Sequence, residues 1–342
     1  MTAPDVTVVI VVYHQRRDLE RLLPTLAQAS RDPLEVLVLD NGARTASGED
    51  TRAWLAEAHP AVRLLALDAN VGYGAANNLG VLEARGEFVL LLNPDTEVHP
   101  GAIDRLRGAL PPQSFVNPCL LLPDGRVNAL GLAVSPGGIA TCDGLYGPAP
   151  TGTSLRAVAA LSGAAIFGRR EDWLKVGGFV PEYFLYGEDV EWSMRALARG
   201  FSLFCVPDAL VVHHYRASLP PHKWFYLARN RRLTFYLALE ESTRRRMRAA
   251  WTLTNVALLL YAAGRGPRYV WADVAAMVWV WHRRRWVADL ARRLAARRIV
   301  PDREVLQRWG HGASPRATER SGGGWGGRLY DHLVRRLAAR AS

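Results

Sequence analysis

Residues 86–98 read Gly-Glu-Phe-Val-Leu-Leu-Leu-Asn-Pro-Asp-Thr-Glu-Val, and this stretch decides the fold. The unbroken apolar run at 88–92 has the length of a strand and no polar alternation, which predicts a strand buried on both faces of a parallel sheet. Pro94 cannot donate to a sheet ladder, so Asn93, Asp95 and Thr96 should lie just beyond the strand's carboxyl end, where open α/β sheets bind ligands. An ordinary Asn-Pro-Asp turn would account for the same residues.

The sequence on either side alternates between strand and helix patterns. Parallel strands need a crossover connection, so this alternation predicts a doubly wound α/β sheet. The expected elements are a strand at 6–13, a helix at 16–29, a strand at 36–39, a helix near 49–58, a strand at 62–66 and a helix at 75–84.

Polar residues follow the strands of this predicted sheet. Tyr13, Asp40, Asn70 and Asp95 each stand just past a strand's carboxyl end, and Gly72 lies close behind Asn70. A nucleotide needs a contact for its base, another for its ribose and a group that neutralises its phosphates. The coincidence favours a nucleotide site over four unrelated turns, although each loop alone is a plausible turn or helix start.

Between residues 100 and 155 the periodicity breaks into short pieces. A hairpin is expected at 120–126, so the sheet should become mixed. Residues 158–167 are then expected to form a buried strand. Its small residues at 162–165 allow a close backbone approach to a ligand, or simply tight packing.

A second acidic group opens a predicted helix that runs from Glu188 to Gly200. Glu188, Asp189 and Glu191 could cap the helix through its dipole, but three carboxylates exceed what capping needs. One of them could act as a general base.

Strands at 202–206 and 210–212 lead into two adjacent histidines. Strand alternation puts His213 and His214 on opposite faces, so at most one can face the ligand crevice. A lone histidine is more often a structural residue than a ligand.

The composition divides the chain into an acidic front and a basic back. Residues 1–215 hold 17 Lys and Arg against 24 Asp and Glu, whereas residues 216–342 hold 26 against 8. The front suits a cation-binding catalytic domain, and the back suits a polyanionic surface such as a membrane leaflet. The three scattered cysteines and the lack of a basic segment before residue 6 favour a reducing, cytoplasmic location without a signal peptide.

The motifs in this order resemble the family 2 inverting glycosyltransferases of GT-A fold, and especially the rhamnosyltransferase-like branch that builds bacterial cell-surface glycans. The resemblance covers roughly residues 5–235 and depends on order and spacing. It rests on residues 8–13, 40–42, 70–78, 93–95 and 187–189 and on His213. It implies a GT-A catalytic domain at 1–235, with a Rossmann-like, doubly wound mixed sheet, followed by a basic, mostly helical region at 236–342.

The resemblance also implies the roles of the site residues. The donor would be a dTDP- or UDP-sugar whose diphosphate is bridged by Mn²⁺ or Mg²⁺. Asp95 and His213 would hold the metal, whereas Asn93 stands where related enzymes commonly have a second acid and is a weaker ligand. Asp189 would take the proton from an acceptor hydroxyl, and its neighbour Glu188 is the alternative base. The remaining residues implied in nucleotide-sugar binding are Tyr13, Asp40, Asn70, Gly72 and Asn78.

The basic tail leaves two interpretations open. Trp271, Trp279, Trp281 and Trp286 surround an arginine run at 283–285, which suits an interfacial helix on anionic lipid at the inner face of the membrane. The same pattern also suits a helical bundle packed on the catalytic domain or a homo-oligomer interface. A flexible linker is expected at 310–327, before a short basic helix at 329–339.

Two other functions compete with glycosyl transfer to a glycan or polyprenyl-linked acceptor. A sugar-phosphate nucleotidyltransferase would need a glycine-rich, lysine-bearing loop after the first strand, and residues 13–17 contain neither residue type. A basic nucleic-acid-binding protein would leave the acidic groups of the front unexplained, so no nucleic-acid partner is expected.

Overall fold

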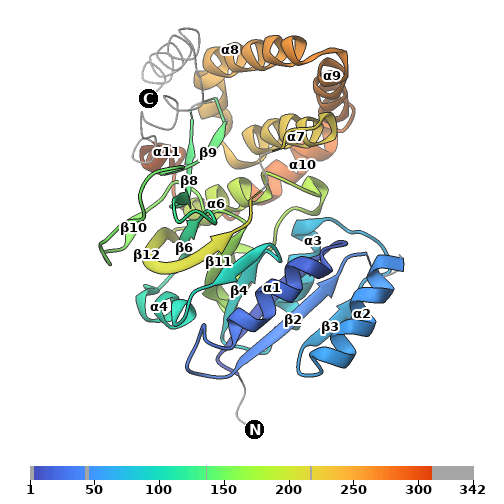
Figure 1. Cartoon of the computed structure of the whole chain (residues 1–342). Coiled ribbons are helices and arrows are strands. Elements are labelled where there is room, and N and C mark those ends of the chain that lie inside the picture. The colour runs from blue at the N-terminus through green and yellow to red at the C-terminus, as the bar shows by residue number, and fades with distance from the viewer. Residues whose placement is uncertain (1–3, 43–45, 136, 216–217, 310–342) are drawn as a thin grey trace.

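The computed structural model describes residues 4–42, 46–135, 137–215 and 218–309. A mixed sheet of ten strands forms its centre, in the order β10-β12-β6-β11-β4-β1-β2-β3, with β5 paired to β12 and β7 to β6 (Figure 1). The expected linker and terminal helix beyond residue 309 lie outside the described residues. The strands of this sheet are β1 (Val6–Val12), β2 (Leu34–Asp40), β3 (Arg63–Ala66), β4 (Phe88–Leu92), β5 (Thr96–Val98), β6 (Ser114–Leu121), β7 (Val127–Ala129), β10 (Arg156–Ala157), β11 (Ala165–Arg169) and β12 (Ser202–His213).

Helices cover both faces of the sheet. Val9 and Val11 of β1 face a core shared with α3, α5 and α6, whereas Val8, Ile10 and Val12 face a core shared with α1, α2 and α4. This alternation along one strand confirms a doubly wound sheet that is buried on both sides. The helices are α1 (Arg16–Leu26), α2 (Ala46–Ala58), α3 (Tyr73–Glu83), α4 (Ala102–Ala109), α5 (Arg170–Val176) and α6 (Glu188–Ala198).

The sheet is mixed because β11 runs antiparallel to both of its neighbours, β4 and β6. The strand expected at 158–167 is shorter than predicted, since only residues from Ala165 onward belong to β11. The preceding segment is held in place by side chains: the Asn117 amide bonds the backbone of Ser162, and the Ser193 hydroxyl accepts from Leu161 N–H at 3.0 Å. The two strands expected at 202–212 form one strand, β12, with a register irregularity between Val206 and Leu210.

The C-terminal helices form a layer at one end of the α/β body (Figure 1). A small hairpin of β8 (Leu132–Val134) and β9 (Ala140–Cys142) reaches toward them. Among the described residues, no helix is both long and apolar enough to cross a bilayer. These helices are α7 (Pro221–Ala238), α8 (Glu241–Arg265), α9 (Pro267–His282), α10 (Arg284–Ala295) and α11 (Asp302–Trp309).

Helix α7 joins this layer to the α/β body. The domain boundary expected after residue 235 falls inside this helix. Arg232 of α7 forms a buried ion pair with Asp273 of α9 at 2.9 Å. Tyr183 precedes the acidic helix α6 in the chain. Its hydroxyl lies 2.8 Å from the Thr234 hydroxyl of α7. The apolar face of α10, around Val287, packs into the same cluster as Leu233. Helix α10 is therefore packed as the bundle interpretation predicts. The apolar face of α10 is covered by protein and is not available to lipid.

Candidate active site

The carboxyl ends of the parallel strands meet at one edge of the sheet, as the sequence predicts. Val12 pairs with Asp40, and Asp40 pairs in turn with Ala66. On the other side of β1, Ile10 pairs with Leu92, the residue before Asn93. The loops that carry Tyr13, Asp40, Asn70 and Asp95 therefore leave neighbouring strands at the same edge.

Asp40 and Tyr13 form one corner of this edge. The Asp40 side chain is buried, and its Oδ1 accepts from Gly42 N–H at 3.0 Å. Its Oδ2 has no hydrogen-bond partner within the described part of the chain. The Tyr13 ring is half exposed and lies against Gly42, where a Cβ would come within 3.3 Å of Tyr13 Cδ2. An unsatisfied carboxylate oxygen beside an open aromatic ring is suited to recognising a flat base with N–H donors.

The loop after β3 is shaped by two asparagines. Asn70 Oδ1 accepts from Gly72 N–H and from Asn41 Nδ2, both at 2.9 Å. Gly72 has a φ of +86°, and a Cβ there would lie 2.6 Å from the Phe184 carbonyl oxygen. Only glycine fits this position, because the loop must pass against the segment that leads to the acidic helix.

Asp95 lies beside His213. His213 Nε2 is 3.4 Å from Asp95 Oδ1, and His213 Nδ1 is 2.9 Å from Asn128 Oδ1. An Nδ1–H bond to that oxygen leaves the Nε2 lone pair directed toward Asp95, which is the tautomer that a metal ligand needs. His214 points elsewhere, with its Nε2 2.5 Å from Glu97 Oε1. The structure thus separates the two histidines in the way that strand alternation predicts.

This corner has donor atoms suited to a divalent cation. Besides Asp95 and His213, Asn93 supplies a buried side-chain oxygen with no partner among the described residues. The Asp95 carboxylate and the His213 imidazole are adjacent donors of the kind that Mn²⁺ or Mg²⁺ accepts, and Asn93, two residues before Asp95, offers a further oxygen; phosphate oxygens and water would add to them. Within the described residues, no group of three or more His, Cys, Asp and Glu side chains gathers to form a complete cage.

The three acids of α6 have different surroundings. Glu191 is fully buried and forms two 2.9 Å bonds with the Arg195 guanidinium, so it is structural. Glu188 is 5% exposed, and its Oε2 has no partner in the described structure. Burial, followed by the charge of Asp189, raises the pKa of Glu188 to about 8.

Asp189 is more accessible than Glu188 and is better provided with donors. Its Oδ2 accepts from Gly163 N–H at 2.9 Å, and its Oδ1 accepts from Val190 N–H at 2.8 Å. Burial raises the pKa of Asp189, whereas these two backbone N–H groups lower it. Gly163 is one of the small residues predicted to allow a close approach, and its partner is this carboxylate.

Tyr73 connects the separate corners of the site. Its hydroxyl donates to the Gly163 carbonyl at 2.6 Å, and its backbone N–H donates to the Phe184 carbonyl at 2.7 Å. The pKa of Tyr73 is raised by burial first and then by the charges of Glu188, Asp189 and Asp95. The Tyr73 hydroxyl and the Asp189 carboxylate therefore meet at the backbone of Gly163.

Two residues of α7 were absent from the site expected from sequence. The Asn230 amide donates to the carbonyls of Tyr183 and Leu185, both at 2.9 Å, and to that of Tyr186. Arg229 donates to the Tyr183 carbonyl at 2.7 Å. The segment that they hold is strained, with φ values of +59° at Phe184 and +68° at Tyr186. The Arg-Asn pair was visible in the sequence, but nothing there placed it against this segment.

Asn78 does not join the expected nucleotide-binding group. Its amide Nδ2 and Oδ1 both bond the backbone of Phe179, at 2.8 Å each. The side chain is therefore engaged by the loop before α6 and does not face the crevice.

A doubly wound mixed sheet with this arrangement of strand-end loops, together with an acid pair at the start of a helix, defines a glycosyltransferase of GT-A fold. Residues 7–111 match the family model described as glycosyl transferase family 2. Over 274 residues the chain is 33% identical to the N-acetylglucosaminyl-diphospho-decaprenol L-rhamnosyltransferase of Mycobacterium tuberculosis, and the match covers 72% of this chain and 88% of that protein. The chain belongs to glycosyl transferase family 2, and the resemblance to its rhamnosyltransferase-like branch is confirmed.

Other relatives and solved structures agree with this assignment. The O-antigen biosynthesis protein RfbC of Myxococcus xanthus is 31% identical over 61% of this chain and 17% of its own length. The crystal structure of GalNAc-T7 with UDP, GalNAc and Mn²⁺ has a TM-score of 0.58 at 17% identity, over 72% of this chain and about half (52%) of that one. A mannosyltransferase from Pyrobaculum calidifontis, solved with GDP-Man and Mn²⁺, has a TM-score of 0.50 at 17% identity, over 100% of this chain and 87% of that one. These likenesses support the GT-A fold.

Proposed function

We propose that the enzyme transfers a sugar, with rhamnose as the leading candidate, from a dTDP- or UDP-sugar to a hydroxyl of a polyprenyl-linked or cell-surface glycan acceptor, with inversion. The observation that carries this proposal is that Asp40 and Asp95 lie at one edge of the sheet, while the Asp189 carboxylate bonds Gly163, whose neighbour Ala164 accepts a bond from Asn93 N–H. The choice of rhamnose and of a polyprenyl-linked acceptor rests on the similarity to the mycobacterial rhamnosyltransferase, which acts on a decaprenol-linked sugar by its name.

The donor would lie along the strand-end loops. Asp40 Oδ2 is an acceptor without a partner in the described chain, so it would bind a base N–H, and the Tyr13 ring would cover the base. Asn70 and Gly72 would shape the loop that approaches the ribose and phosphates. Asp95, His213 and Asn93 would hold the divalent cation, which when bound neutralises the charge of the diphosphate.

Asp189 would act as the general base. It accepts the proton of the acceptor hydroxyl as that oxygen bonds to the anomeric carbon. The bond from this carbon to the diphosphate breaks on the opposite side, and its electron pair leaves with the nucleoside diphosphate. Asp189 suits this role better than Glu188, because two N–H donors favour its ionised form. Glu188 would stay protonated near neutral pH, since burial holds its pKa at about 8.

A donor screen tests the proposal. The full chain is incubated with dTDP-rhamnose and a panel of UDP-sugars, with Mn²⁺ or Mg²⁺ and an N-acetylglucosaminyl-diphospho-lipid acceptor. We expect acceptor-dependent release of one nucleoside diphosphate and an inverted glycosidic linkage by NMR. A matched reaction with a sugar 1-phosphate and nucleoside triphosphates tests the nucleotidyltransferase alternative. Release of pyrophosphate in that reaction, without transfer in the first, would overturn the proposal.

A further inference from the structure

A cavity of about 200 Å³ opens beside the acid pair. Tyr186, Gly187 and Val190 form one wall, and these residues flank Glu188 and Asp189 in the chain. The tip of the β8–β9 hairpin and helices α7 and α8 form the others. The cavity thus lies between the α/β body and the helical layer. Three of its lining residues belong to the start of α6 or directly precede it.

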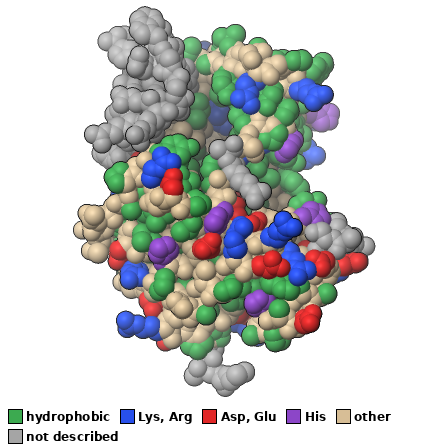
Figure 2. All heavy atoms as spheres, viewed as in Figure 1, with side chains coloured by type: hydrophobic (Ala, Val, Ile, Leu, Met, Phe, Trp, Pro, Cys, Tyr) green, Lys and Arg blue, Asp and Glu red, His purple; other side chains and the backbone are tan. Residues whose placement is uncertain are grey.

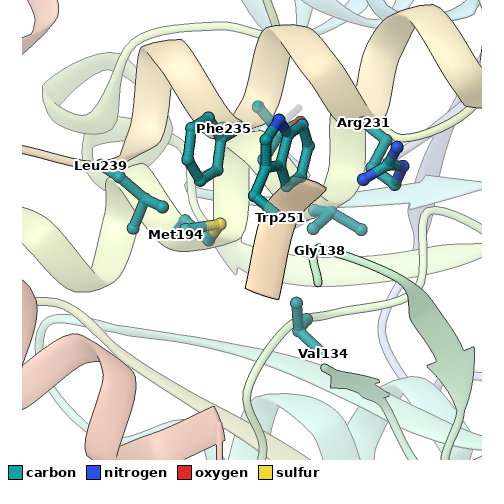
Figure 3. Close-up of a pocket in the computed structure, with 9 residues that line it drawn as sticks. Val134, Gly138, Met194, Arg231, Phe235, Leu239 and Trp251 are labelled. Atoms are coloured by element: carbon teal, nitrogen blue, oxygen red, sulfur yellow. The ribbon is translucent and has the colours of Figure 1, made fainter. Parts of the chain in front are cut away.

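An aromatic stack lies next to this cavity, against the lining residue Arg231. Trp251 of α8 lies flat on Phe235 of α7 with ring centroids 4.0 Å apart, and the Arg231 guanidinium lies over Trp251 at 4.2 Å (Figure 3). The space among these residues is only about 10 Å³, too little for a ligand. This stack therefore packs α8 on α7 beside the larger cavity.

The lining of the large cavity is mainly apolar. Ile139, Trp224, Leu227, Ala228 and Leu258 contribute most of its hydrophobic side chains. The lining cation, Arg231, is already engaged by the Gly137 carbonyl at 2.9 Å and by Asn255 Oδ1 at 2.6 Å. Such a surface gains free energy by excluding water, so it selects an apolar occupant.

A lysine lies next to one wall residue of the cavity, Tyr186. The ammonium of Lys223 lies 4.7 Å from the ring centroid of Tyr186, which itself lines the cavity, and 5.7 Å from that of Tyr215. No carboxylate in the described residues pairs with it within 4.0 Å, unlike Lys175, which is paired with Asp172 at 3.1 Å. Burial lowers the pKa of Lys223, so an anion beside it would restore the stability of its charged form.

We infer that this cavity binds the first isoprenoid units of a polyprenyl-phosphate-linked acceptor and that Lys223 binds the phosphate of that acceptor. This inference rests on the proposed function and deepens it, because it names the acceptor class and the residues that select it. The apolar cavity and the ammonium share the wall residue Tyr186, so one acceptor molecule would place its isoprenoid in the cavity and its phosphate beside Lys223.

The size of the cavity is consistent with a short piece of isoprenoid chain. An engineered apolar cavity of about 150 Å³ holds one benzene molecule. A space of about 200 Å³ therefore takes one or two five-carbon units, and the rest of a long chain would continue outside.

Direct binding tests the inference without requiring transfer. Farnesyl diphosphate, farnesol and inorganic pyrophosphate are titrated into the full chain by calorimetry. We expect farnesyl diphosphate to bind at least 10-fold more tightly than either fragment. Ala140→Phe, at an exposed lining position, should weaken its binding about 10-fold. Thr141→Phe, the neighbouring exposed position outside the lining, is the matched control and should bind normally.

The lysine has its own pair of variants. Lys223→Met should weaken farnesyl diphosphate binding about 10-fold and leave farnesol unchanged, whereas Lys223→Arg should retain most of the affinity and Lys175→Met all of it. UDP titrations with Mn²⁺ separate the two sites. Loss of UDP affinity in Lys223→Met would assign the lysine to the donor and overturn its acceptor role. Normal UDP binding with no binding of farnesyl diphosphate would overturn the cavity assignment and leave the proposed function intact.

Discussion

Adjacent carboxylates at 188 and 189 differ because their surroundings differ. Asp189 receives two backbone N–H bonds, whereas Glu188 Oε2 is buried without a partner in the described structure. We expect Asp189→Asn to reduce single-turnover transfer by about 10²- to 10⁴-fold, because the amide cannot take a proton. Donor affinity, measured by calorimetry, should barely change. Glu188→Gln is the matched control and should keep most of the transfer rate. Wild-type transfer by Asp189→Asn would eliminate this residue as the base.

Glu188 should also make stability depend on pH. Its pKa in the folded protein is raised from 4.5 to about 8, so between these values the folded state keeps a proton that the unfolded state releases. Stability attributable to this group is therefore complete below pH 4.5 and falls as pH rises toward 8. Glu188→Gln removes this loss. Its advantage in the free energy of unfolding should be small near pH 5 and reach about 1–3 kcal/mol at pH 8.

Urea denaturation of both proteins at pH 5, 6.5 and 8 measures this difference. Glu87→Gln, at an exposed acid, serves as the control for a change of net charge. A constant difference between Glu188→Gln and the wild type at all three pH values would show that burial does not hold the proton on Glu188.

The two histidines give a prediction about the metal. His213→Ala should weaken Mn²⁺-dependent UDP binding by about 10- to 100-fold, because His213 Nε2 lies next to Asp95. His214→Ala should have little effect, since its ring contacts Glu97. Calorimetry with and without Mn²⁺ measures both, with Asp95→Ala as the reference for full loss. Equal behaviour of the two histidine variants would remove His213 from the site.

At the scale of elements, the strained segment before α6 depends on α7. Asn230→Ala removes three hydrogen bonds to the carbonyls of this segment. We expect transfer to fall at least 10-fold and the amides of residues 183–189 to exchange faster, because these bonds hold the positive-φ backbone together with those that Arg229 and Tyr73 make to the same segment. Asn255→Ala, which removes bonds within α8 and to Arg231, is the control and should leave this segment protected. A uniform loss of protection would indicate a general stability role instead.

Local patterns predicted most of the elements, and side-chain contacts explain the exceptions. The apolar runs at 6–12 and 88–92 were predicted to be strands, and both are confirmed as β1 and β4. The two strands pair in parallel, so their carboxyl ends lie at the same edge of the sheet. Residues 158–161 are also apolar, but Ser193 bonds the backbone of Leu161 and Asn117 bonds that of Ser162, and β11 begins only at Ala165. Such contacts join residues more than 30 positions apart, and no local periodicity reveals them.

The candidate site followed the same rule. Residues at strand ends, such as Asp40 and Asp95, could be found because topology alone brings them to one edge. The roles of Asn78 and Asn230 depend on which backbone each amide reaches, and this is fixed only by the packing of the loops before α6. Similarly, Glu191 could not be told apart from its two neighbours until Arg195 was seen to pair with it.

At the scale of the whole molecule, the tail both packs internally and presents an apolar surface. Trp279 and Trp286 pack on the cluster around Leu233, and their ring centroids lie 6.2 Å apart in an edge-to-face arrangement. Trp271 and Trp281 are instead 72% and 64% exposed. Figure 2 shows apolar side chains together with basic ones over the helical part of the face in view. The tryptophans expected to face lipid are therefore divided between two roles.

The exposed set forms the α8–α9 surface, which we propose as the membrane-binding face. It carries apolar side chains at helical spacing on both helices, and exposed arginines at 265, 268 and 283–285 lie at the ends of α9. Apolar area combined with positive charge is what holds a peripheral protein on anionic lipid. The defining apolar residues are Val256, Leu260, Trp271, Val274, Val278 and Trp281.

Liposome flotation of the full chain tests this last prediction. A truncation after α7 is unsuitable, because it would expose the cluster that α9 and α10 cover. The triple variant Leu260→Ser, Trp271→Ser, Trp281→Ser should reduce flotation with phosphatidylglycerol vesicles about 10-fold, since it removes the most exposed apolar anchors.

The matched control replaces two exposed leucines elsewhere, Leu82→Ser on α3 and Leu174→Ser on α5, and should float like the wild type. Flotation of the wild type should weaken as salt is raised or as phosphatidylglycerol is replaced by phosphatidylcholine, because the arginines contribute through screened charge. If the triple variant floats as well as the control does, then the α8–α9 surface is not what holds the enzyme on lipid. The α8–α9 surface would in that case be a candidate site for binding another protein. Delivery of the acceptor to the cavity beside Gly187 would not depend on this surface.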